Sequence, residues 1–311
     1  MKKRLIFIVG PTATGKTEIA CALAKPLHAE IISCDAMQVY KEFSLLTAKP
    51  TAKLLKAVQH HLVGIISIQK EFDVFTFRTQ VLRAISLIEK KKKIPVIVGG
   101  SGLYMSILLD GIFEEKQRGR NLGIRKKIED EIAEKGQEAL YEKLKTVDPA
   151  SALKIHVHDT RRIIRALEVF EVYGKPISAL HRERKGLYNS HEVSIFALSM
   201  KREDLYARIN KRVDSIFQEG VVDEVKKIKS KKIGQTASGI IGLKEIQAFL
   251  TGALSEKEAK ELIKRNTRRY AKRQLTWFRK DKRLQWVDVK PQEEAWHIAA
   301  KILKLMGEQH V

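Results

Sequence analysis

The stretch LIFIVGPTATGKT (residues 5–17) decides the fold, because a short apolar run breaks here into a glycine-rich turn. Its last eight residues fit the spacing G-x-x-x-x-G-K-[ST], and the turn lies between a strand-like segment (5–9) and a helix-like segment (18–24). Strand, turn and helix in this order are what a phosphate-binding loop requires. The stretch therefore predicts an α/β protein with a phosphate site where its first strand ends.

The chemistry of this loop favours a diphosphate or triphosphate ligand. Backbone N–H groups of such a turn converge on a concavity, and the helix that follows adds the positive end of its dipole. Lys16 would bring a positive charge to phosphate oxygens, and the Thr17 hydroxyl would help to hold Mg²⁺, the cofactor we expect. The loop residues expected to bind the diphosphate or nucleotide are Gly10, Pro11, Thr12, Ala13, Thr14, Gly15, Lys16 and Thr17.

The charge balance indicates a polyanionic partner. Among 311 residues, 59 Lys and Arg stand against 37 Asp and Glu, which leaves a net charge of +22. Such an excess suits a nucleic acid better than a small metabolite, although a well-solvated basic surface has the same composition. The two cysteines form no C-x-x-C pair, so we expect neither disulfides nor zinc, and a cytoplasmic location. No segment has the apolar length of a membrane span, so we expect no membrane partner.

Two further strand-like runs end in residues of chemical interest. The run 30–35 ends in Asp35, and because parallel strands share one carboxyl edge, we expect Asp35 to face the same crevice as the phosphate loop. The run 94–98 continues into GGSGLY (99–104), where many ATP-hydrolysing enzymes and kinases have an acid. Its absence argues against a simple ATPase. Small residues there would let the backbone approach a ligand, and Ser101 offers a hydroxyl.

Two other polar features leave alternatives open. Gln38 could read the edge of a nucleobase, because an amide both donates and accepts hydrogen bonds, or it could be a plain surface residue. His60 and His61 are adjacent, so both cannot face one metal ion from a regular element. We interpret them as structural, or as contacts to phosphate or backbone.

The middle of the chain predicts an all-helical insertion. From 113 to 190 the sequence is highly charged with helical periodicity, including one pattern at 125–144 that Gly136 interrupts. A second helix is expected after Asp159 or Thr160, either of which can cap it. Strand character returns at residue 193. We therefore expect a catalytic core from 1–112 and 191–311, and a separate helical domain from 113–190.

Two groups of cations could contact nucleic acid. Arg161, Arg162 and Arg165 lie near the start of the expected helix and suit phosphates or an RNA backbone, or else pair with nearby glutamates on a solvated face. The segment 264–283 holds ten Lys or Arg and one acid, with aromatic residues among them. Charge for phosphates and flat rings for bases are typical of RNA-binding helices. We expect at least one of the adjacent Trp277 and Phe278 to belong to the core.

Taken together, these features resemble the tRNA dimethylallyltransferases (tRNA isopentenyltransferases), and the resemblance covers essentially the whole chain. It implies a P-loop NTPase-like core with a parallel sheet flanked by helices. The order and spacing of the motifs carry the resemblance: GPTATGKT (10–17), DAMQVY (35–40), TAKPT (47–51), HHL (60–62), GGSGLY (99–104), DTRRIIRALEV (159–169), GKPIS (174–178), IIGLKE (240–245) and NTRRYAKRQLTWFR (266–279).

The resemblance implies transfer of a dimethylallyl group from dimethylallyl diphosphate to N6 of the adenine just 3′ of the anticodon. Asp35 matches the general base, Arg208 the arginine beside the leaving diphosphate, and Ser101 a position that usually holds threonine. The implied partner is the tRNA anticodon stem-loop, which the helical domain at 113–190 would contact, and we expect a monomer. The expected tRNA contacts are Asp35, Ala36, Met37, Gln38, Ser101, Asp159, Thr160, Arg161, Arg162, Ile163, Arg269 and Arg273.

Four positions depart from the family pattern. Ala36 replaces a serine, Glu42 and Leu46 replace glycines, and Leu243 replaces a tyrosine. These departures bear on local tRNA contacts and loop geometry. They leave the expected reaction class unchanged, because Asp35 and the phosphate loop are retained.

Two other functions are weighed against the leading one. An isopentenyltransferase acting on free adenine nucleotides would need neither the helical insertion nor the basic C-terminal helix. An ATP-dependent RNA-binding protein or kinase would need the acid that is missing after the strand at 94–98. Under the leading hypothesis the loop holds a prenyl diphosphate, and any ATP binding there would be incidental.

Overall fold

The computed structural model describes residues 2–113 and 122–308, and its chain divides into two compact units. The first unit comprises Met1–Leu108 and Ser190–Val311, and the second comprises Leu109–Asn189. The expected helical insertion (113–190) includes residues 114–121, which lie outside the described residues.

The first unit is built on a six-stranded, all-parallel sheet in the order β3-β2-β4-β1-β5-β6, which confirms the predicted α/β class. The strand order reverses beside β1, because β4 pairs with one edge of it and β5 with the other. In open parallel sheets, ligands bind at the carboxyl edge beside such a reversal. The strands are β1 (Lys3–Val9), β2 (Ala29–Ser33), β3 (His60–His61), β4 (Ile94–Gly99), β5 (His191–Ser199) and β6 (Gln285–Asp288).

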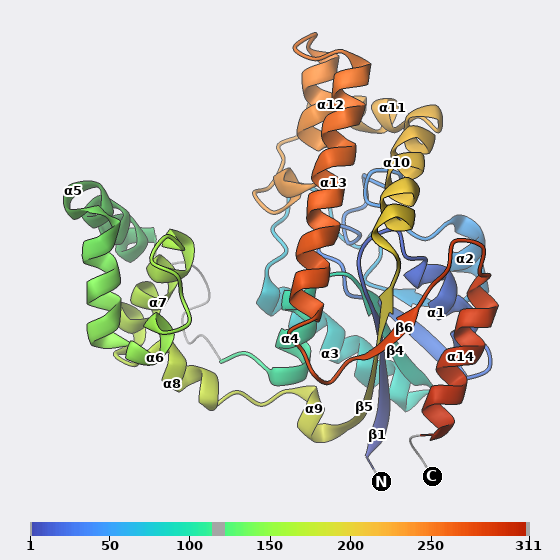
Figure 1. Ribbon diagram of the computed structural model, residues 1–311, viewed down its shortest axis with the longest axis horizontal. Coiled ribbons are helices and arrows are strands. Elements are labelled where there is room, and N and C mark those ends of the chain that lie inside the picture. The colour runs from blue at the N-terminus through green and yellow to red at the C-terminus, as the bar shows by residue number, and fades with distance from the viewer. Residues whose placement is uncertain (1, 114–121, 309–311) are drawn as a thin grey trace. The chain divides into compact units, whose positions relative to one another are not determined.

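Strand β1 is the centre of the core. Its consecutive residues Leu5, Ile6, Phe7 and Ile8 are all buried, which requires helices on both faces of the sheet. Figure 1 shows α1 and α14 on one face and α3 and α4 on the other. These helices are α1 (Lys16–Ala24), α14 (Ala295–Glu308), α3 (Val74–Lys90) and α4 (Gly102–Asp110).

A helical arm follows β5 in the same unit. Its longest helix, α13, begins in a capping box in which the side chains of Ser255 and Glu258 each accept the other's backbone N–H. Helices α10 and α12 pack against α13, which contains residues 264–278 of the predicted basic segment (264–283), while residues 279–283 follow the helix (Figure 1). The members are α10 (Arg202–Gln218), α11 (Val221–Lys226), the 3₁₀ turn η1 (Ala237–Gly239), α12 (Leu243–Leu250) and α13 (Glu256–Phe278); a short helix α2 (Ala52–Ala57) precedes β3.

The second unit is helical in its described part. As predicted, Gly136 interrupts α5, with φ 79° and ψ 168°, and the Asp159 side chain caps α7. Gly174 ends α7 in the left-handed region at φ 64°, where glycine is favoured. Apolar side chains of α5, α6 and α7 form its core. The helices are α5 (Leu122–Val147), α6 (Pro149–Ala152), α7 (Thr160–Tyr173), α8 (Ile177–Arg182) and α9 (Leu187–Ser190).

No helix in the described ranges combines the length and apolar character that a membrane crossing requires.

Candidate active site

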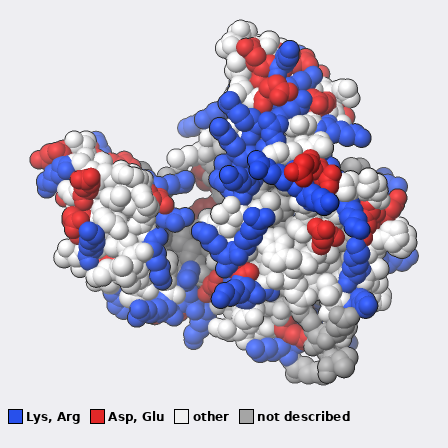
Figure 2. Space-filling model, in the orientation of Figure 1, with Lys and Arg blue, Asp and Glu red and all other residues white. Residues whose placement is uncertain are grey.

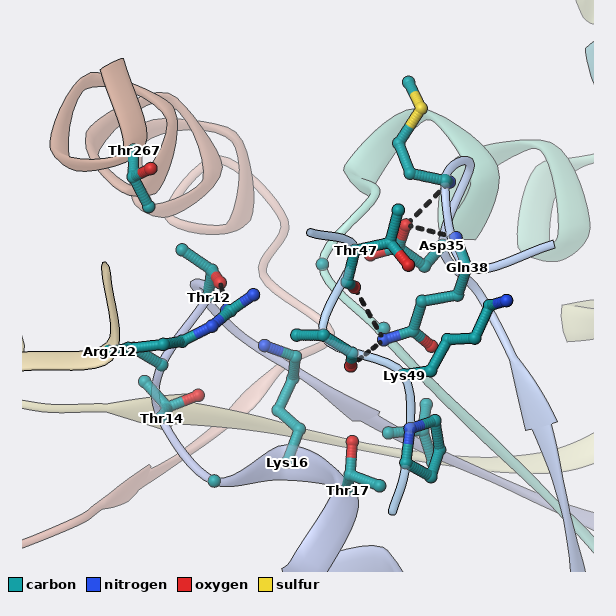
Figure 3. A pocket seen from close by; sticks show the side chains of 18 of the residues that line it. Thr12, Thr14, Lys16, Thr17, Asp35, Gln38, Thr47, Lys49, Arg212 and Thr267 are labelled. Atoms are coloured by element: carbon teal, nitrogen blue, oxygen red, sulfur yellow. Dashed lines mark hydrogen bonds between the residues drawn. The ribbon is translucent and has the colours of Figure 1, made fainter. Parts of the chain in front are cut away.

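A pocket of about 980 Å³ opens at the carboxyl edge of the sheet, and the residues that line it all belong to the first unit. Its volume is at the upper end of the range for small-molecule sites. The walls come from the phosphate loop, the segment after β2, and helices α10 and α13 (Figure 3). The structure thus brings the loop residues 12–17 and the segment 35–38 into one cavity, as the strand order requires.

The phosphate loop offers unoccupied backbone donors to this pocket. Gly15, the residue before α1, is left-handed at φ 81°, a conformation that glycine adopts without strain. The hydroxyl of Thr14 donates to the carbonyl of Pro11 at 2.9 Å and closes the turn. Within the described chain, the N–H groups of residues 13–17 meet no acceptor. With the dipole of α1 behind them, these donors form an anion site.

Two cations and one carboxylate act on the same space. Lys16 Nζ donates to the Pro11 carbonyl at 2.5 Å, and burial lowers its pKa to about 8, while nearby Asp35 acts to raise it. Arg212, on α10, donates from Nη1 to Thr12 Oγ1 at 3.2 Å. Burial also lowers the pKa of Arg212, and Asp35 again opposes this shift. The positive charges of Lys16 and Arg212 would attract a diphosphate, and the Asp35 carboxylate lies in the same pocket and could act as a base.

Arg208, which the sequence singled out, lies at the rim of the pocket and donates from Nη2 to the Pro291 carbonyl at 2.8 Å. Its role beside the diphosphate stays a prediction. Arg212, one helical turn further on, is the arginine that contacts the phosphate loop, and the sequence argument did not select it. The signal was present, because Arg212 follows the buried Ile209 by three residues and precedes the buried Ile216 by four. It therefore lies closer to the apolar stripe than Arg208 does.

Asp35 lies two residues after Ser33, the last residue of β2. Its Oδ1 accepts the N–H groups of Met37 at 2.8 Å and of Gln38 at 3.3 Å (Figure 3). No donor among the described residues contacts Oδ2. One oxygen therefore fixes the orientation of the carboxylate, while the other remains available in the pocket.

The Gln38 side chain is used within the protein. Its Nε2 donates to the Ala48 carbonyl at 2.8 Å, and its Oε1 accepts from the Ser33 hydroxyl at 2.9 Å. The amide joins the end of β2 to the loop that follows. This structural role is neither of the two alternatives that the sequence left open, and base reading by Gln38 stays a prediction.

The loop at 36–51 is held by carboxylates that sequence reasoning missed. Glu224 of α11 accepts the N–H groups of three consecutive residues, 44 to 46. Glu42, which replaces a glycine of the family pattern, accepts from the Ser67 hydroxyl at 2.9 Å and from the Ile68 N–H at 3.0 Å. Because both contacts link residues that lie far apart in the chain, no local pattern indicated them.

The GGSG segment after β4 packs against protein. A Cβ on Gly99 would lie 2.0 Å from the Cys34 carbonyl oxygen, and a Cβ on Gly100 would lie 2.1 Å from Nε2 of Gln274. These glycines therefore admit neighbouring protein atoms, and both also line the pocket, so the expected close approach of a ligand stays a prediction. Ser101 accepts from the Tyr104 N–H at 3.4 Å at the start of α4 and is not among the residues that line the pocket. Its catalytic role stays a prediction.

Helix α13 carries a strongly basic surface. Figure 2 shows Lys and Arg gathered over this helix. Trp277 is 40% exposed and Phe278 is fully buried, so the aromatic pair divides between surface and core as expected. No acidic residue of the described chain forms an ion pair with the exposed cations Arg265, Arg269, Lys272, Arg273, Arg279 and Lys280.

In the second unit, the expected tRNA segment 159–163 has exposed and buried members. Arg161 and Arg162 are exposed, and Arg162 pairs with Asp159 at 3.3 Å. Ile163 is only 1% exposed and its N–H bonds to the Asp159 carbonyl. Its side chain therefore builds the core of the unit, which differs from the contact that we expected. The Thr160 hydroxyl donates to the Gln137 side chain at 2.7 Å.

The remaining polar candidates serve the structure. Arg165 pairs at 3.2 Å with Glu168, which is buried, so this part of the cluster matches the ion-pair alternative more than an RNA site. His61 contacts the buried Glu30 at 2.8 Å, and His60 Nδ1 lies 2.8 Å from the Val58 carbonyl. Among the described residues, no three His, Cys, Asp or Glu gather in a way that could hold a metal ion.

Comparisons with known proteins agree with this architecture. The family model described as IPP transferase matches residues 38–281. A tRNA dimethylallyltransferase of Geobacter sulfurreducens is 42% identical over 92% of this chain and 92% of its own length. The crystal structure of the tRNA isopentenylpyrophosphate transferase of Bacillus halodurans has a TM-score of 0.71 at 36% identity, covering 99% of this chain and 98% of that one. A eukaryotic dimethylallyltransferase acting on tRNA has a TM-score of 0.80 at 27% identity, covering 99% and 79%.

Proposed function

The chain belongs to the IPP transferase family, and from this premise we propose that it transfers a dimethylallyl group from dimethylallyl diphosphate to N6 of the adenine 3′-adjacent to the anticodon of tRNA. The observation that carries the proposal is the placement of the Asp35 carboxylate in the same pocket as the open phosphate loop, Lys16 and Arg212. A base opposite an anion site is what a transfer from a diphosphate to an amine requires.

The diphosphate is the leaving group, and the pocket is equipped to stabilise the charge that develops on it. The free N–H groups of residues 13–17 and the ammonium of Lys16 would surround its oxygens, with Arg212 beside Thr12. Fixed donors of this kind act where charge appears in the transition state. Apolar side chains line the same pocket and suit the five-carbon group: Leu45, Leu46, Leu54, Ile240, Ile241 and Ile263.

The residues present fit a Mg²⁺ ion that is shared with the diphosphate. The Thr17 side chain lines the pocket, and it makes no hydrogen bond within the described chain. Mg²⁺ prefers hard oxygen ligands and is usually held by one or two protein groups together with substrate phosphates, so it needs no acidic cluster, and residues 2–113 and 122–308 contain none. When bound, the ion would neutralise part of the diphosphate charge.

Asp35 is positioned to accept the proton of the reacting amine. The bond between N6 and the allylic carbon forms as the bond from that carbon to the diphosphate oxygen breaks, and N6 loses a proton. The amine is a poor nucleophile because its lone pair is delocalised, so proton removal matters. Oδ1 of Asp35 is held by two backbone N–H groups, which leaves Oδ2 to receive this proton.

The tRNA would bind through the exposed cations of α13, including Arg269 and Arg273, and through Arg161 and Arg162 of the second unit. The target adenine lies in a stacked loop, so it must leave the stack to reach the pocket. We propose that the protein acts as a monomer, because a single chain supplies the phosphate loop, Asp35, Lys16 and Arg212 to one pocket.

Nucleoside mass analysis tests the proposal directly. Purified protein, dimethylallyl diphosphate, Mg²⁺ and unmodified tRNA should yield adenosine that carries one dimethylallyl unit at the position 3′ of the anticodon. A matched tRNA with inosine at that position lacks the N6 amine and should yield none. Parallel reactions offer AMP, ADP and ATP as acceptors. Product on these nucleotides in preference to tRNA would assign the protein to the free-nucleotide reaction instead.

A further inference from the structure

Gln274 connects the phosphate loop to helix α13. It lies near the end of the helix, is 5% exposed, and is the polar member of the helix's buried residues. Its Oε1 accepts the Thr12 N–H at 2.9 Å, and its Nε2 donates to the Gly100 carbonyl at 2.9 Å. The amide therefore joins three segments that are distant in the sequence.

The surroundings of this amide allow little else to replace it. A Cβ on Gly100 would lie 2.1 Å from Nε2, so the backbone approaches Gln274 as closely as a glycine permits. An apolar side chain of similar length would leave the Thr12 N–H and the Gly100 carbonyl without partners. Buried polar groups left in that state are destabilising.

The contact acts on the shape of the phosphate loop. Thr12 is held twice, through its N–H by Gln274 and through its hydroxyl by Arg212, from 262 and 200 positions away. The next residue, Ala13, has φ 67°, a left-handed conformation that disfavours residues other than glycine. Such a conformation persists only where surrounding contacts impose it. The two anchors on Thr12 impose it here, and they keep the N–H of Thr12 turned to Gln274 while those of residues 13–17 stay free.

Helix α13 also lines the pocket close to Gln274. Tyr270 and Arg273 of α13 line the pocket, one turn and one residue before Gln274. A displacement of the helix would therefore move these side chains and the loop relative to each other.

We propose that Gln274 is a positioning residue that holds the phosphate loop in its diphosphate-binding shape and fixes the loop to helix α13. The proposal rests on the proposed function for its substrates, because it concerns the donor half of that reaction. It predicts that loss of Gln274 acts on the diphosphate, while the exposed cations of α13 continue to bind tRNA.

Two variants break the contact from opposite sides. Gln274→Met keeps the length of the side chain and removes both hydrogen bonds, and Gly100→Ala displaces the amide. Each should weaken binding of inorganic pyrophosphate with Mg²⁺, measured by calorimetry, on the order of 10-fold to 100-fold. Each should also raise the KM for dimethylallyl diphosphate more than the KM for tRNA. The double variant should lose less than the product of the two single losses, because both remove one interaction.

A rescue separates positioning from general stability. Ala13→Gly relieves the left-handed strain, so in the Gln274→Met background it should restore part of the pyrophosphate affinity. Thr276→Ala, an exposed change on the same helix, is the matched control and should leave affinity and KM unchanged. Thermal melts show that each variant is folded.

Unchanged pyrophosphate affinity in folded Gln274→Met and Gly100→Ala would overturn the proposal, as would equal rises in both KM values. Pyrophosphate binding needs no prenyl transfer, so the outcome is readable even if tRNA is not the acceptor. Failure of the parent protein to modify tRNA would instead overturn the proposed function.

Discussion

Two loops line the pocket, and they are built in different ways. The phosphate loop (10–17) takes most of its shape from its own neighbours, through the left-handed Gly15, the Thr14 contact to Pro11 and the helix that follows. The loop at 36–51 takes its shape from a distance, because Glu224 lies about 180 positions from the N–H groups it accepts. Local contacts therefore specify most of the first loop, with Thr12 as the exception, and tertiary contacts specify the second.

The two loops also differ in what they leave to a ligand. In the phosphate loop the N–H groups of residues 13–17 meet no acceptor among the residues that the structure describes, so an anion can use them. In the second loop the N–H groups of residues 44–46 are already taken by Glu224. The first loop can therefore bind an anion, and the second is a fixed wall that directly follows Asp35, the proposed base. The proposed function thus places diphosphate binding in the first loop and proton transfer beside the second.

The largest effect should come from separating these assignments. Asp35→Asn keeps the shape of the side chain and removes its basicity, so turnover should fall on the order of 10²-fold to 10⁴-fold. At pH 7, pyrophosphate affinity should stay close to that of the parent, because the phosphate loop is intact. Single-turnover assays and calorimetry measure the two quantities. A variant that transfers the prenyl group at the parent rate would remove Asp35 as the base.

Within the phosphate loop, Thr12 is held by two distant side chains, Gln274 and Arg212. A substitution of Arg212 tests one of these contacts. Arg212→Lys keeps a charge but shortens the reach to Thr12 Oγ1, so kcat/KM for dimethylallyl diphosphate should fall on the order of 10²-fold, as for loss of a donor in a charged site. Arg208→Lys is the matched change one turn away, where the guanidinium contacts the Pro291 carbonyl, and it should cost much less. Equal losses would mean that both arginines reach the diphosphate.

The contrast between local and distant contacts also explains which features could be predicted from the sequence. The phosphate loop, Asp35 at the sheet edge, the strands at 5–9, 30–35 and 94–98, the strand from 193 and most of the basic helix are marked by contiguous patterns, and the structure has them in those places. The short strand β3 (His60–His61) was not predicted, because two residues carry too little pattern. Arg212 could have been predicted from its position on α10, because it lies closer to the buried face of the helix than Arg208 does. Glu224 and Gln274 carry no local signal, because a buried amide or a carboxylate that caps distant N–H groups looks like any polar residue on an amphipathic helix. Ile163 shows the reverse case, since a motif position can belong to the core.

The distant support of the second loop can be removed at its source. Glu224→Ala leaves three backbone N–H groups without their acceptor, so the free energy of unfolding should drop by about 1–3 kcal/mol. Turnover should fall further than pyrophosphate affinity, because the wall beside Asp35 loosens while the phosphate loop does not. Asp223→Ala, at an exposed ion pair on the same helix, is the control. Denaturant melts and both activity assays give the comparison, and a parallel loss in both assays would contradict separate construction.

The smallest effect is a pH dependence that belongs to the phosphate loop alone. The pKa of Lys16 in the free protein is about 8, lowered by burial, and a bound diphosphate would raise it because the anion favours the ammonium form. Above pH 8, binding must therefore take up a proton. Affinity for pyrophosphate should be insensitive to Lys16 below pH 8 and should weaken above it by up to about 10-fold per pH unit.

Lys16→Met isolates this contribution. The variant should bind more weakly at neutral pH and should lack the additional slope above pH 8, because any titration of pyrophosphate itself is common to both proteins. Asp35→Asn alters the other loop and removes the carboxylate that favours the charged form of Lys16, so its slope should begin at a lower pH than in the parent. Calorimetry between pH 7 and about 9.5 resolves the three curves. Parallel curves for the parent and Lys16→Met would mean that Lys16 does not meet the diphosphate, whereas a shifted onset in Asp35→Asn would show that the two loops, though built separately, share one electrostatic field.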